Sequence, residues 1–131
     1  MRRKKTERRK LIEKLDKICR KYVLLRDKNI CQKCGKHVDK SGAHCSHVIP
    51  RSAGNYLRWN PMNLKLLCFH DHINWWHKNP LEAAEWFKKK FPHRLAYLEK
   101  RRHKIIKYSI GDLEYLFESL KNDVKSGNLI G

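Results

Sequence analysis

The chain has 131 residues, of which 31 are lysine or arginine and 13 are aspartate or glutamate, so its formal net charge is +18 at pH 7. This length predicts a single domain with a small core. The charge excess indicates a polyanionic partner, and nucleic acid accounts for it better than a merely solvated surface does. No stretch approaches the apolar length of a membrane-spanning helix, so we expect no membrane partner.

The N-terminal part, residues 1–28, is predicted to be a basic helix. Between residues 5 and 26, apolar side chains recur at spacings of three and four among lysines and arginines, which is the pattern of an amphipathic helix. The basic start of the chain is not followed by the apolar region of a secretion signal. We therefore expect a cytoplasmic protein.

Residues 29–78 differ in character and are expected to carry the chemistry. Glycines and a proline punctuate short segments there, and residues 43–49 are compatible with a strand. Residues 60–77 read as a turn, an apolar run and then a helix. The middle of the chain is thus predicted to be short and rich in β-structure.

Residues 79–126 are predicted to form a C-terminal helical extension. Asn79 is the expected N-cap of its first helix, and Pro92 ends that helix. A second helix is expected over about residues 93–107, and Asp112 is expected to cap a last one. Residues 127–131 are expected to form a frayed tail.

The cysteines favour a metal site. Five cysteines, an odd number, argue against a disulfide framework in a cytoplasmic chain. Cys31 and Cys34, followed by a glycine, form half of a zinc knuckle, and Cys68 begins the second half. The fourth ligand is His70 or Asp71, of which histidine is the more usual zinc ligand.

Three further segments of the chain contain a histidine or an asparagine in an order that is known from a protein family. His47 lies in "SHVIPRS", Asn63 begins "NLKLLC", and His72 stands nine residues after Asn63. Together with the cysteine pair, this series resembles the HNH, or ββα-metal, endonucleases. The phrase "LRWNPMN", residues 57–63, is also similar to one in the phage NinG/Rap recombination endonucleases.

The resemblance implies an α+β fold: a small zinc-stapled ββα-metal core between a basic N-terminal helix and C-terminal helices. It also implies catalytic roles for three residues. His47 titrates near neutrality and can take a proton from water. His72 would hold a divalent ion that stabilises the transition state. The Asn63 amide would orient the His47 ring or pin the loop.

One position departs from the family pattern. Most members carry an aspartate or histidine directly before the base, where this chain has Ser46, a poor ligand. His44 shares a strand face with residue 46 and is therefore the candidate second metal ligand. His77 is a further candidate. Phosphate contacts are expected from three basic residues, namely Arg51, Arg58 and Lys65.

The sequence therefore predicts a metal-dependent DNA endonuclease, and the NinG-like phrase favours a phage-type enzyme that acts on branched DNA in the host cytoplasm. A homing or restriction-type HNH nicking enzyme is one alternative. A catalytically inactive zinc-containing DNA-binding protein is another. The expected cofactors are structural Zn²⁺ and a catalytic Mg²⁺ or Mn²⁺, with Zn²⁺ or Ni²⁺ as alternatives. A homodimer is a possible form, because two symmetric cuts need two sites.

Overall fold

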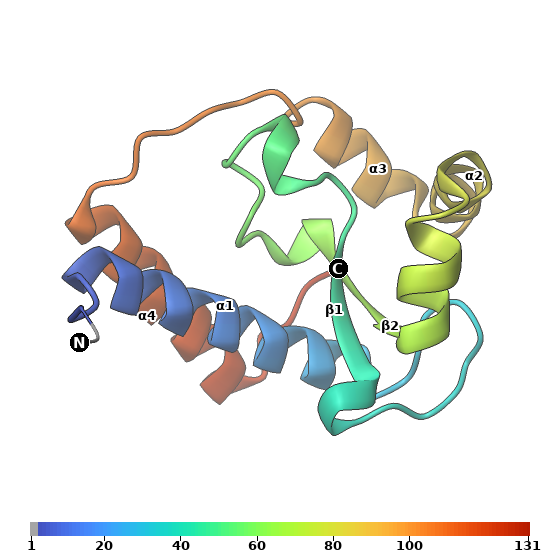
Figure 1. The fold of residues 1–131 in the computed structure, drawn as a ribbon, viewed down its shortest axis with the longest axis horizontal. Helices are drawn as coiled ribbons and strands as arrows, with labels where there is room; N and C mark the ends of the chain where they lie inside the picture. Colours follow the sequence, from blue (N-terminus) through green and yellow to red (C-terminus); the bar gives the residue numbers. More distant parts are fainter. Residues whose placement is uncertain (1–2) are drawn as a thin grey trace.

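The computed structural model describes residues 3–131, and its centre is a two-stranded sheet followed by a short helix (Figure 1). Strand β1 (Ala43–His47) pairs antiparallel with β2 (Leu64–Cys68), so that His47 lies opposite Leu64. The π-helix η4 (His70–Trp76) follows β2 almost at once. This succession of strand, strand and helix agrees with the expected α+β class.

The first and last helices pack side by side along one flank of the sheet (Figure 1). Helix α1 (Glu7–Arg26) begins at Thr6, whose side chain accepts a hydrogen bond from the Arg9 amide. Helix α4 (Ile110–Ser126) begins at Ser109, which shares a capping box with Asp112. The cap predicted at Asp112 therefore lies three residues earlier. The two helices and the sheet bury one apolar cluster, which includes Leu11, Leu15, Leu66, Leu113 and Leu120.

Helices α2 (Pro80–Lys90) and α3 (Pro92–Glu99) cover the other flank (Figure 1). Asn79 precedes α2 as expected, although its side chain makes no capping hydrogen bond. Phe87 and Leu98 form a second apolar cluster with Leu57. No helix within residues 3–131 has the length and apolar character needed to cross a membrane.

The prediction of a helix over residues 93–107 is wrong for its second half, because α3 ends at Glu99. The side chain of Asn55 accepts a hydrogen bond from the Ile106 amide at 2.7 Å and donates one to the Ile106 carbonyl at 2.5 Å. Gly54 lies so close that a Cβ there would be 2.9 Å from the Lys104 oxygen. These contacts hold residues 104–107 outside any helix or strand, against the loop that follows β1.

The end of the chain makes contacts that its local composition did not predict. Residues 127–131, expected to fray, fold back onto the last turn of α1. The Ile130 amide donates to the Tyr22 hydroxyl at 2.6 Å, and Arg26 donates to the Ile130 carbonyl at 3.3 Å. Local composition predicted mobility here, but contacts with a distant helix hold the segment.

Candidate active site and metal site

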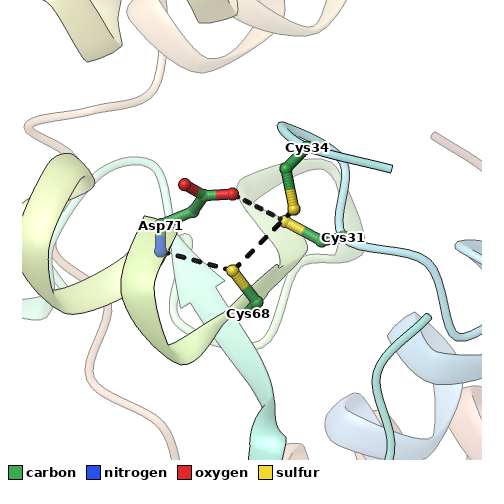
Figure 2. A group of neighbouring side chains, drawn as sticks. All are labelled: Cys31, Cys34, Cys68 and Asp71. Carbon is green, nitrogen blue, oxygen red and sulfur yellow. Dashed lines mark hydrogen bonds between the residues drawn. The ribbon is translucent and has the colours of Figure 1, made fainter. Parts of the chain in front are cut away.

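Three cysteines and one aspartate meet where β2 runs into η4 (Figure 2). Cys31 and Cys34 lie in a tight turn that Gly35 completes with a φ of +77°, a conformation that favours glycine. Cys68 ends β2, and Asp71 lies in the first turn of η4. The Cys31 thiol donates to Asp71 at 3.2 Å, and the sulfurs of Cys34 and Cys68 are 4.0 Å apart. The ligand atoms of all four residues lie within 4.8 Å of one another.

This cluster could hold a metal ion, and its geometry fits zinc. Four ligands at Zn–S distances of about 2.3 Å in a tetrahedron have sulfurs roughly 3.8 Å apart, close to the 4.0 Å between Cys34 and Cys68. Burial disfavours the charged form of Asp71, but hydrogen bonds from the three thiols hold its pKa below the usual range. His70, the other candidate fourth ligand, is exposed and lies outside the cluster.

A second cluster consists of three histidines. His44 comes from β1, His72 from η4 and His77 from the residue after η4. The Nδ1 atoms of His44 and His72 are 2.9 Å apart, and Nε2 of His72 is 3.1 Å from Nε2 of His77. Burial, with the nearby His77 and His44, lowers the pKa of His72 to about 4. The ring of His72 is therefore neutral at physiological pH, which is the form that binds metals.

His47 ends β1, and its ring is half-buried. Its Nε2 lies 3.1 Å from the carbonyl oxygen of Arg58. A carbonyl can only accept, so Nε2 carries the proton and Nδ1 keeps its lone pair. Burial lowers the pKa of His47, and the charges of Arg51, Lys65 and Arg58 lower it further against the effect of the carbonyl contact. A neutral ring with a free Nδ1 can accept a proton.

Asn63 is fully buried and holds the loop between the two strands. Its Oδ1 accepts from the Ile49 amide at 2.7 Å, and its Nδ2 donates to the carbonyls of Ile49 and Leu57 at 3.0 and 3.2 Å. Of the two expectations for this amide, the loop contact is the one observed, because the His47 ring is held by the Arg58 carbonyl instead.

The histidines His44, His47 and His72 line one groove of about 460 Å³ between α1 and β1. Arg20, Arg51 and Arg58 line the same groove, which makes it strongly basic. Arg58 binds Asp16 at 3.0 Å and stacks over Trp59 at 4.8 Å. Its Nε is buried and has no hydrogen-bond partner within the described residues.

Lys65 is not available for the phosphate contact expected of it, since its side chain is 0% exposed. Nζ donates to the Ser46 hydroxyl at 3.0 Å and lies 3.2 Å from the centre of the Trp76 ring. Burial lowers the pKa of Lys65 well below its usual range. The prediction was wrong because η4 covers this face of β2. Ser46 is equally buried and bound to Lys65, so it has no role as a metal ligand.

Arg20 was missed by sequence reasoning. Its guanidinium donates to the carbonyls of Ala43 and Lys40 at 2.5 Å each, along the free edge of β1. Asp16, four residues earlier on the same helix face, holds Arg58. The sequence did contain one signal for this role: Asp16 and Arg20 are four residues apart and therefore share a helix face beside Cys19. Only the fold shows that this face meets β1.

Residues 31–75 match the family model described as HNH endonuclease. This segment contains the cysteine cluster, both strands and almost all of η4, so the match supports the HNH family and suggests a nuclease. No curated protein and no solved structure matches the chain.

Proposed function

We propose that the protein is a metal-dependent DNA endonuclease in which His47 is the general base. One observation carries the proposal: His47, whose Nε2 is held by the Arg58 carbonyl, lines the same basic groove as the paired rings of His44 and His72. A base beside a candidate ion site and several arginines is what phosphodiester hydrolysis needs. The matched HNH segment adds independent support.

The chain's own residues have distinct roles in this proposal. Nδ1 of His47 takes a proton from the water whose oxygen attacks the phosphorus, while the bond from phosphorus to the 3′-oxygen breaks. The Arg58 carbonyl orients the ring. Asn63 is a positioning residue, because it fixes the loop that carries Arg58. Arg51 and Arg58 hold flanking phosphates.

His44 and His72 would hold the catalytic ion through their Nδ1 atoms. The further candidate, His77, meets the opposite nitrogen of His72, Nε2, and would not share that ion. Tetrahedral Zn–N bonds of about 2.0 Å place ligand nitrogens roughly 3.3 Å apart, and the two Nδ1 atoms are 2.9 Å apart. An all-imidazole donor set suits Zn²⁺ or Ni²⁺ better than Mg²⁺ or Mn²⁺. When bound, the ion supplies charge stabilisation of the transition state and of the leaving oxygen.

The cysteine cluster would hold a structural Zn²⁺ rather than a catalytic one. Three thiolates and a carboxylate close the tetrahedron and leave no open position. When bound, such an ion would link the Cys31–Cys34 turn to the junction of β2 and η4, the helix that carries His72. In a chain of this size, a structural metal site contributes much of the stability of the fold.

Branched or otherwise structured DNA is the proposed substrate. Its support is the NinG-like phrase at residues 57–63 and the basic N-terminal helix, which suits contacts to the DNA backbone. A homing or restriction-type enzyme is less favoured, because no dedicated sequence-reading motif accompanies the matched segment. An inactive DNA-binding protein is less favoured, because it would need no histidine in the groove that also contains the paired rings of His44 and His72.

The test is cleavage of a labelled panel consisting of a four-way junction, a flap, a single strand and a duplex. Each is incubated with Mg²⁺, Mn²⁺, Zn²⁺ or Ni²⁺. His47→Ala should lower the cleavage rate by about 10²- to 10⁴-fold while DNA binding and zinc content stay at the wild-type level. His93→Ala, at an exposed histidine on α3, is the matched control and should cleave normally. Binding by the wild-type protein without cleavage under any condition would favour the inactive binding protein.

A further inference from the structure

A pocket of about 510 Å³ lies on the other side of His47 from the basic groove. Its walls are largely apolar and come mainly from four segments: the loop after β1, η4, α2 and α3. They include Val48, Ile49, Trp76, Phe87 and Leu95. Apart from His47 and His77, no residue that lines this pocket has a role in the proposed hydrolysis or in the cysteine cluster.

His47 lines both the groove and the pocket, so the pocket opens at the proposed reaction centre. A nucleotide whose phosphate lies at His47 has its base only one sugar away. We propose that the pocket takes an unpaired nucleobase next to the scissile phosphate. This inference rests on the proposed function and deepens it, because it names the feature of DNA that the site selects.

The chemistry of the walls fits a base. Aliphatic and aromatic side chains can stack on either face of a planar ring, whatever the base. The charged residues Lys88 and Arg102 stand at the pocket with Glu85 and Glu99, and all four are exposed. They can meet the polar edges of the base and its neighbouring phosphate. The excess positive charge of the chain favours a polyanion over an apolar peptide as the occupant.

The walls are held firmly before any ligand arrives. The buried Nζ of Lys65 lies over the Trp76 ring at 3.2 Å, which fixes the indole from inside the fold. Phe87 is buried and contacts Phe91 with their ring centres 5.2 Å apart. A preformed pocket loses little freedom on binding.

Selection of unpaired DNA follows from this geometry. In a perfect duplex each base is stacked and paired, so it must be extruded before it can enter a pocket. A base in a bulge or at a branch is already unpaired. The pocket therefore favours branched or bulged DNA over perfect duplex without reading a sequence.

The experiment measures binding by fluorescence anisotropy without added divalent ions, so that no cleavage occurs. Three oligonucleotides are compared: a duplex, the same duplex with one unpaired nucleotide, and that bulged duplex with the unpaired base replaced by an abasic site. The base-bearing bulge should bind roughly tenfold more tightly than the other two, as expected for one stacked base. Equal affinity for the base-bearing and abasic bulges would overturn the inference.

A variant pair tests the location. Ala84→Phe fills the pocket from an exposed position on α2 and should remove the preference for the base. Leu81→Phe, on the same helix at a side chain 85% exposed and outside the pocket, should keep it. A preference that survives in a folded Ala84→Phe variant would place the base elsewhere. The comparison of wild-type affinities stands even if this variant does not fold.

The outcomes also separate the two proposals. Base-dependent binding without cleavage after ions are added would leave the pocket in place and remove the nuclease. Cleavage that is equally fast on the duplex and on both bulged substrates would support the nuclease and contradict the nucleobase pocket.

Discussion

Nε2 of His47 lies 3.1 Å from the carbonyl oxygen of Arg58, so the end of β1 and the loop before β2 meet at the ring. The carbonyl fixes both the orientation of the imidazole and the nitrogen that carries its proton. Any change that shifts this loop therefore also shifts the proposed base.

The rate of cleavage should depend on pH through His47. Burial lowers the pKa of this ring below its ordinary value of 6.5, and only the neutral form accepts a proton. We expect kcat/KM to rise with pH to a plateau already reached at neutrality, with a midpoint below 6.5. His47→Ala should lower the rate by about 10²- to 10⁴-fold. A midpoint above neutrality would contradict the assignment of His47 as the base.

The fourth ligand of the cysteine cluster can be tested with three variants. Asp71→Ala should lose zinc and melt at a lower temperature, because an open coordination position remains. Asp71→Cys should keep the ion, since it supplies a fourth thiolate at the same place. His70→Ala should change neither property, because His70 lies outside the cluster. Metal analysis and thermal melts measure all three, and loss of zinc from His70→Ala would reverse the choice of ligand.

Asn63→Ala should destabilise the fold by about 2–4 kcal/mol, because it leaves one buried amide and two carbonyls without partners. Urea unfolding measures the change. Asn122→Ala, at an exposed position on α4, is the control and should stay within about 0.5 kcal/mol of wild type. An equal and small effect of both substitutions would show that the loop does not depend on the Asn63 amide.

Lys65→Met should leave DNA affinity unchanged, whereas Arg51→Ala should reduce the salt dependence of binding by about one phosphate contact. Lys65 is fully buried, but Arg51 is exposed in the groove. Titrations at several salt concentrations separate the two residues. A flatter salt dependence in Lys65→Met would mean that Lys65 reaches the DNA after all.

The same Lys65→Met variant should change how stability depends on pH. Burial lowers the pKa of Lys65 in the folded state, so the unfolded chain binds its proton more tightly. This contribution to stability is present above the unfolded pKa of about 10.4 and is lost as pH falls toward the folded pKa. Lys65→Met should therefore gain stability relative to wild type as pH falls from 10. A difference that does not vary with pH would show that Lys65 stays charged in the fold.

Local patterns in the sequence predicted much of the centre of the fold. The cysteine spacing led to the Cys31, Cys34 and Cys68 group, and the apolar spacing led to α1. Both signals depend on residues close together in the chain. The choice of Asp71 over His70 depended on where the first turn of η4 places each side chain, which the general preference of zinc for histidine does not give.

The errors arose where distant segments meet. The segment after α3 is extended because Asn55, 51 residues away from Ile106, binds its backbone. Every residue of β2 is buried, since helices cover both faces of the small sheet. The strand therefore has no alternation of apolar and polar residues from which the burial of Lys65 could be predicted. Such contacts between remote segments outweigh local propensity.

The pairing of α1 with α4 has a consequence for the order in which the chain can fold. Leu11 and Leu15 are covered by Leu113 and Leu120, which are synthesised almost a whole chain length later. At translation speeds of about 5–20 residues per second, the apolar face of α1 stays exposed for several seconds before α4 is synthesised. The cysteine turn, both strands and η4 are complete before then, so the centre can form first and the two outer helices close around it last.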